Sequence, residues 1–261
     1  MSWLLYRIEF SFDEVFVYSP SINPLEIIGY VIVFFILVFA LMGTFHLFKN
    51  YRETKRVPTF YFFLCYAFFL IAGSFLIIEK ISFSTLRSPD LGVSMSILSL
   101  INVTLAFICG LRYILLSTYP RYVNIIHFFG TIVIVLCYGL LIFGTITGPP
   151  NAHIQNYEMV YSPLINLVVY ITCIPLISIL TLPFYIYAFR MRNEDRPNFN
   201  RTFWLGTGVL VFFVGLLADV GPFFPSILSI PFRILMLSGT FIMYVSFFMP
   251  QWFKNRIGWK D

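Results

Sequence analysis

Long apolar runs separated by short polar segments form the dominant pattern of the chain. The clearest pair lies at 203–220 and 226–248, on either side of the turn Gly-Pro-Phe-Phe-Pro at 221–225. A run of about 18 or more apolar residues is long enough to cross a bilayer as an α-helix. Five further runs of this kind come earlier in the chain, so the pattern predicts an all-α integral membrane bundle of seven transmembrane helices.

Only short segments flank the predicted bundle of residues 25–248. Residues 1–24 form an aromatic, mildly acidic arm, which we expect outside the cell or at the membrane surface. Residues 249–261 form a cytoplasmic tail in which Trp252 and Trp259 accompany basic residues, as interfacial anchors do. The predicted spans are 25–48, 59–78, 91–116, 122–143, 162–189, 203–220 and 226–248.

Composition supports the membrane interpretation. Hydrophobic residues make up 59% of the chain and charged residues only 11%. Soluble domains carry about 25% charged residues, so an ordinary soluble protein is excluded. The net charge of +5 does not indicate a nucleic-acid partner, because the basic residues gather in alternate loops. That arrangement sets membrane topology, so we expect a lipid bilayer and no nucleic acid as the surroundings.

The basic residues are shared unevenly between the two faces of the predicted bundle. Of 17 Lys and Arg residues, twelve fall on one face, three on the other, and Arg112 and Arg233 lie inside spans. The positive-inside rule places the richer face in the cytoplasm. Only an odd number of spans places all the basic loops and the basic tail on the same face of the membrane. We therefore expect the N-terminus outside and the C-terminus inside. The twelve residues are Lys49, Arg52, Lys55, Arg56, Arg121, Arg190, Arg192, Arg196, Arg201, Lys254, Arg256 and Lys260.

Two charged residues lie within the last pair of spans. Asp219 is near the end of the sixth span and Arg233 is early in the seventh. An ionisable residue inside a span marks a functional site or an internal pair by default. We expect Asp219 and Arg233 to pair at the outer end of the bundle. The pair is then either purely structural or the charged floor of an outward-facing pocket, with Glu79 and Lys80 on its rim.

Polar and small residues also follow one face of the seventh span and one face of the third. Their spacings of three, four and seven keep them on one side of a helix. Such stripes must face protein or water, so they predict a ligand cavity between spans three, six and seven, or else packing contacts between helices. The predicted ligand-binding residues are Asp219, Arg233, Glu79, Lys80, Ser99, Asn102, Thr240 and Tyr244.

The residues needed for catalysis or for a bound cofactor do not group in the sequence. All lysines lie in loops or tails, which excludes the Schiff base of a retinal protein, and His46 and His127 have no further metal ligands beside them. The four cysteines fall within apolar spans without CxxC spacing, so we expect small buried residues. We therefore expect no cofactor, no metal and no enzymatic activity.

The chain leaves its last span through the segment Met-Pro-Gln-Trp-Phe-Lys-Asn-Arg-Ile at 249–257. Seven helices, short loops, an outside N-terminus and this exit resemble the seven-helix sensor region at the front of some prokaryotic histidine kinases. The resemblance implies a sensor in a prokaryotic plasma membrane. No output domain follows the bundle in this sequence, so it also implies signalling through a separate cytoplasmic protein.

These patterns together predict a receptor-like sensor. It would bind a small or lipid-like ligand within the bundle and report it by a change in helix arrangement. Two alternatives remain open: a small transporter or channel whose stripes line a path, and an accessory subunit whose stripes pack against other chains. A transporter should carry polar residues through mid-membrane to both faces, whereas a sensor needs them on one side only.

Overall fold

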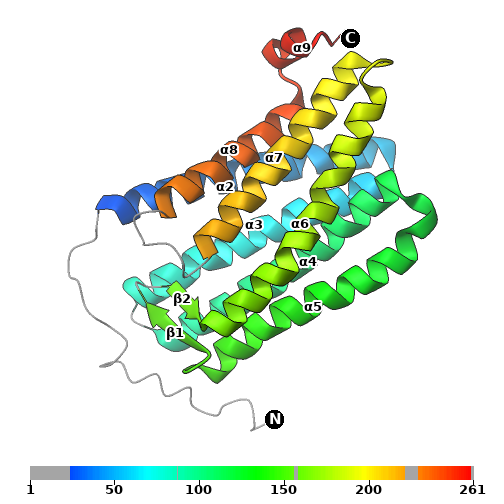
Figure 1. Cartoon of the computed structure of the whole chain (residues 1–261). Coiled ribbons are helices and arrows are strands. Elements are labelled where there is room, and N and C mark those ends of the chain that lie inside the picture. The colour runs from blue at the N-terminus through cyan, green and yellow to red at the C-terminus, as the bar shows by residue number, and fades with distance from the viewer. Residues whose placement is uncertain (1–23, 87, 156–157, 221–228, 260–261) are drawn as a thin grey trace.

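The part of the chain that the structure describes folds into long antiparallel helices and one short β-hairpin (Figure 1). The computed structural model describes residues 24–86, 88–155, 158–220 and 229–259, without the side chains of residues 24–27, 155, 158, 219, 220 and 229. The elements are α2 (Pro24–Thr54), α3 (Val57–Ser84), α4 (Pro89–Thr118), η1 (Pro120–Tyr122), α5 (Val123–Thr147), β1 (Ala152–Gln155), β2 (Glu158–Tyr161), α6 (Pro163–Met191), α7 (Arg196–Val220), α8 (Ser229–Phe248) and α9 (Gln251–Ile257).

Seven helices within the described residues are long and apolar enough to cross a membrane. The shortest of these spans, Ile230–Phe248, has 19 residues. At 1.5 Å per residue it is about 28 Å long, which matches a hydrocarbon core of roughly 30 Å. The predicted all-α bundle of seven membrane helices is therefore confirmed.

Local sequence signals explain where several helices begin and end. Proline stands in the first turn of α3, α4 and α6, where its missing N–H removes no helical hydrogen bond. The Ser162 hydroxyl accepts a hydrogen bond from the backbone N–H of Ile165 and so caps α6. Gly148 and Gly258, both with positive φ, follow the ends of α5 and α9.

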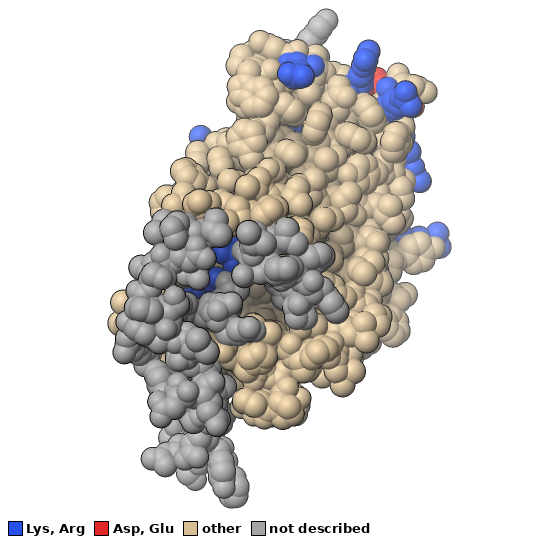
Figure 2. All heavy atoms as spheres, turned by 60° about the vertical axis from the view of Figure 1, so that its left-hand side comes forward, with Lys and Arg blue, Asp and Glu red and all other residues tan. Residues whose placement is uncertain are grey.

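Consecutive spans alternate in direction, so the bundle has two chemically different ends. We call the end that carries β1 and β2 the hairpin end. The other, called the basic end, carries the α2–α3, α4–α5 and α6–α7 connections and α9 (Figure 1). Figure 2 shows most of the visible Lys and Arg side chains toward the top and edge of the molecule, beside a broad uncharged surface. Which end faces the cytoplasm stays a prediction.

The seven spans form a closed ring in sequence order. Each span packs against the next, α8 returns to pack against α2, and a smaller contact joins α4 to α6. Aromatic side chains fill the ring at mid-height. The centroid of the Phe107 ring lies 5.8 Å from that of Phe69, 5.5 Å from that of Tyr138 and 5.3 Å from that of Phe213. We call these four residues the aromatic plug.

Glycines allow the backbones of α7 and α8 to approach each other closely. A Cβ atom added to Gly239 of α8 would lie 2.5 Å from the backbone nitrogen of Phe212 and 2.7 Å from the carbonyl oxygen of Gly208. A Cβ atom on Gly215 of α7 would likewise meet the backbone of α8, 2.7 Å from the Phe232 carbonyl oxygen. Small residues therefore set the distance between these two helices.

The structure differs from the sequence-based boundaries in instructive ways. α2 continues to Thr54 and α7 already begins at Arg196, because a helix keeps its own hydrogen bonds beyond the apolar stretch that hydropathy detects. The connection between α5 and α6, expected to be a plain loop, contains the β1–β2 hairpin. The tail expected at the interface contains the short helix α9. All four cysteines are buried free thiols, as expected.

Candidate functional site

A group of buried polar side chains lies at the hairpin end, beneath β1 and β2. The two strands pair antiparallel with Ala152 opposite Tyr161. Ile154 of β1 packs in one apolar cluster with Phe83 of α3 and Val93 of α4, which seats the hairpin on these helices. Gly92 allows this packing, since a Cβ atom there would lie 2.1 Å from the Phe83 ring.

Tyr161 is the centre of the group. Its hydroxyl lies 2.9 Å from the Thr145 hydroxyl of α5. Because Thr145 donates its own proton to the Leu141 carbonyl, it accepts the proton of Tyr161. The Ser96 hydroxyl of α4 also lies near the Tyr161 side chain. Burial raises the pKa of Tyr161 to about 12, and the nearby charge of Glu79 acts in the same direction.

Glu79 of α3 is the acidic member of the group. Only 4% of its surface is exposed. The backbone of Met159 and the charge of Lys80 lie near its carboxyl group. The carboxyl oxygen Oε2 is buried and has no hydrogen-bond partner within the described part of the chain. We call Glu79, Ser96, Thr145, Tyr161 and the Met159 backbone the hairpin-end cluster.

The hairpin-end cluster is also tied to the start of α6. The side-chain amide of Asn166 donates a buried hydrogen bond of 2.9 Å to the carbonyl oxygen of Tyr161. The cluster therefore joins α3, α4, α5 and α6 through one tyrosine and one carboxylate. A buried carboxylate oxygen that lacks a donor can bind a ligand that supplies one, because its lost hydration is otherwise not replaced.

The predicted pair of Asp219 and Arg233 is described only in part. The side chain of Asp219 lies outside the described residues, so the pairing stays a prediction. Arg233 is buried, with 8% of its surface exposed. Its guanidinium faces α2, since a Cβ atom on Gly29 would lie 2.6 Å from Nη1. Lys80 also faces α2, with Nζ 5.5 Å from the centre of the Tyr30 ring.

The other predicted site residues contact either their own helix or a neighbouring one. Ser99 donates to the Ala72 carbonyl of α3, which makes it a contact between helices. Asn102 and Thr240 donate to the carbonyls of Leu98 and Met236, each within its own helix. The Tyr244 ring packs 5.3 Å from that of Phe39 and 4.0 Å from that of Phe248, measured between centroids.

The two predicted stripes lie on helices that pack mainly against different neighbours. α4 packs mainly against α3 and α5, whereas α8 packs mainly against α7 and α2. In the closed ring these two spans are separated on both sides by other helices. The ligand cavity expected between spans three, six and seven stays a prediction.

Of the ligand-binding residues predicted from the sequence, only Glu79 belongs to the hairpin-end cluster. The prediction did not include Ser96, Thr145 and Tyr161. The alternating direction of the spans is a signal that could have placed Ser96 and Thr145 near the depth of Glu79. Tyr161 offered no such signal, because it lies in a connection where no strand was expected.

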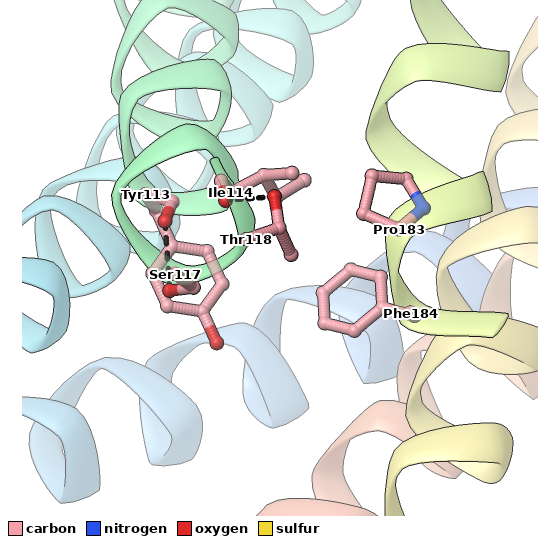
Figure 3. Close-up of a pocket in the computed structure, with 6 residues that line it drawn as sticks. All are labelled: Tyr113, Ile114, Ser117, Thr118, Pro183 and Phe184. Carbon is pink, nitrogen blue, oxygen red and sulfur yellow. Dashed lines mark hydrogen bonds between the residues drawn. The ribbon is translucent and has the colours of Figure 1, made fainter. Parts of the chain in front are cut away.

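A small gap near the basic end contrasts with this cluster (Figure 3). It lies between α4 and α6, with a volume of about 10 Å³, and Tyr113, Pro183 and Phe184 are among its lining residues. Ser117 and Thr118 turn their hydroxyls back to the carbonyls of Tyr113 and Ile114. A gap of this size holds at most one water molecule, so it is a packing defect rather than a ligand site.

The fold and the cluster define the class of this protein as an integral membrane protein of seven helices, with a buried polar group at one end. No family model, no curated protein and no solved structure matches the chain. The resemblance to the sensor region of histidine kinases therefore stays a prediction, and the function has to be argued from the site itself.

Proposed function

We propose that the protein is a membrane sensor that binds a small ligand at the hairpin-end cluster. The observation that carries the proposal is Glu79, a buried carboxyl group whose Oε2 has no hydrogen-bond partner among the described residues. A ligand with a hydrogen-bond donor, best a protonated amine, would supply the missing partner. Hydrogen bonds to an ionised group contribute about 1.5–3 kcal/mol, enough for selective binding.

The distribution of buried polar residues favours a sensor over a transporter. The hairpin-end cluster occupies one end, and the aromatic plug fills the middle of the ring. Nearer the basic end, the buried hydroxyls of Thr181 and Ser246 donate to carbonyls of their own helices. A transport path needs polar groups that continue to both faces, and this arrangement offers them mainly at one.

The connections of the cluster supply a route for a signal. Glu79, Ser96 and Thr145 come from three helices, and Tyr161 is joined to the start of α6 by Asn166. A ligand that fits one arrangement of these helices better than another shifts the population toward that arrangement. The same helices end in the loops of the basic end, where a separate cytoplasmic protein would read the change.

Thermal unfolding of the purified protein in detergent tests the ligand class. The probes are ethanolamine and spermidine as cations, with acetate and glucose for comparison. We expect at least one cation to raise the melting temperature of the wild type and of Glu53→Gln, but not of Glu79→Gln. Glu53 is a matched control, because it is an exposed carboxylate of α2 at the basic end.

Two results would contradict the proposal. Equal stabilisation of the wild type and Glu79→Gln, or no response of the wild type to any cation, would exclude Glu79 as the binding group for this class. Uptake of the stabilising cation into proteoliposomes that contain the wild type, and not into those that contain Glu79→Gln, would make the protein a transporter.

A further inference from the structure

A groove of about 370 Å³ opens at the basic end between α7, α8 and α9. Its volume lies within the range of about 300–1,000 Å³ that is typical of small-molecule sites. The walls are Trp204 of α7 and Phe241 of α8, and Trp252 and Phe253 of α9 line its other side. Arg256 is the charged residue of the lining. The groove thus combines an apolar surface with one positively charged side chain.

The side of the groove formed by α9 is held in place by specific contacts. The Asn200 side chain donates to the carbonyl oxygen of Ile257 at 3.5 Å. The guanidinium carbon of Arg201 lies 5.8 Å from the centre of the Trp259 ring, while its Nε donates to the Ser246 carbonyl of α8. Phe253 and Ile257 share an apolar cluster with residues of the end of α8. The groove is therefore preformed.

The position of the groove matches the boundary between lipid tails and headgroups. Trp204 and Phe241 lie within membrane-spanning helices and are exposed by 42% and 43%, so hydrocarbon surrounds them. α9 follows directly after the last span and carries Lys254 and Arg256. Tryptophan and basic residues together are typical of this boundary. An occupant must therefore be apolar at one end and polar at the other.

We propose that this groove binds one anionic phospholipid of the surrounding leaflet. The acyl chain lies along Trp204 and Phe241, and the phosphate lies beside the Arg256 guanidinium. Charge complementarity selects the headgroup, since the lining carries a cation and, among the described residues, no carboxylate. A zwitterionic phospholipid shares the apolar contacts but lacks the net charge. The site is separate from the hairpin-end cluster and lies at the opposite end of the bundle.

Native mass spectrometry with added phospholipids tests the charged half of the site. The probes are phosphatidylglycerol and phosphatidylcholine with identical acyl chains. We expect the wild type to bind one phosphatidylglycerol more tightly, and Arg256→Gln to weaken that binding about five- to tenfold while leaving phosphatidylcholine unchanged. Arg192→Gln is the matched control, because Arg192 is also exposed at the basic end but does not line the groove.

The apolar half is tested in the same way with Phe241→Ala. We expect weaker binding of both phospholipids, whereas Phe129→Ala, which removes an exposed phenylalanine of α5, should leave both unchanged. If Arg256→Gln and Arg192→Gln weakened phosphatidylglycerol binding equally, the preference would reflect a general attraction of the lipid to the basic end. That result would overturn the proposal. Displacement of the lipid by inorganic phosphate at equal concentration would overturn it too, in favour of a free-anion site. Unchanged melting temperatures of the variants verify that they are folded.

Discussion

Tyr161 and Glu79 share a buried environment although they lie far apart in the sequence. The hydroxyl of Tyr161 donates to Thr145, and the carboxyl group of Glu79 lies near the backbone of Met159 in β2. Each residue is buried with a polar group. Tyr161 of the hairpin finds its partner on a helix, and Glu79 of a helix lies beside the hairpin backbone. Loss of the hairpin contact would expose both groups at once, and the two should respond together to changes in that region.

The raised pKa of Tyr161 predicts a loss of stability at alkaline pH. In the unfolded chain the hydroxyl loses its proton near pH 10, but in the folded protein only near pH 12. The contribution of the neutral hydroxyl is therefore fully present below pH 10 and lost as the pH rises to 12, an effect of about 2–3 kcal/mol. Between these pH values the melting temperature of Tyr161→Phe should fall less steeply than that of the wild type.

Tyr122→Phe serves as the control for this pH series. Tyr122 is exposed at the basic end, so its removal should leave the pH dependence of the melting temperature as in the wild type. If Tyr161→Phe and Tyr122→Phe give parallel curves from pH 9 to pH 12, Tyr161 does not carry the effect.

At the scale of elements, the α7–α8 pair shows how glycine sets a distance between helices. Gly208 and Gly239 face each other so closely that the backbone of one helix touches the backbone of the other. In lipid, where apolar burial gives no separate driving force, such close packing is a main source of helix association. Here it fixes the last two spans against each other, and thereby the position of Arg233 relative to α2.

Gly239→Ala should therefore destabilise the bundle. The new methyl group would stand 2.5 Å from the Phe212 nitrogen, and backbone cannot turn aside as a flexible side chain can. Overpacking of this kind costs about 1–3 kcal/mol. Gly139→Ala in α5 is the control, because nothing lies within 4 Å of its added Cβ atom. A fluorescence melting curve in detergent that shifts equally for both variants would contradict the close approach.

At the scale of the whole molecule, the alternating spans put the basic connections at one end. This arrangement follows from the odd number of helices and the short loops, and it leaves only the absolute orientation to be measured. The positive-inside rule predicts that the basic end is cytoplasmic and the hairpin end outside.

Cysteine labelling on intact cells checks this orientation. Asn151→Cys, next to β1, should react with an impermeant maleimide, whereas Arg52→Cys and Arg196→Cys should react only after the membrane is opened. The four native thiols are buried, so a wild-type control should give little background. Labelling of Arg196→Cys without labelling of Asn151→Cys on intact cells would reverse the topology.

The sequence was most informative where hydropathy alone decides the structure. The number of spans, their alternation and the burial of the cysteines could all be predicted, because lipid admits apolar helices and little else. Hydropathy does not specify which faces of the helices meet. Ser99 and Thr240 looked like parts of one site, yet Ser99 bonds to α3 and Thr240 to its own helix. Tyr161 was missed because strand pairing in a short loop leaves almost no trace in apolar periodicity.

The contact between α2 and α8 also governs how the protein can be made. Among the seven described spans α2 is synthesised first and α8 last, yet their side chains interlock, with Phe39 against Phe241 and His46 against Phe248 at 5.6 Å and 4.3 Å between ring centroids. Until α8 emerges from the ribosome, six spans can form only an open arc, and the face of α2 that will meet α8 stays turned toward lipid. Entry of the final span into the bilayer is thus the event that seals the interior.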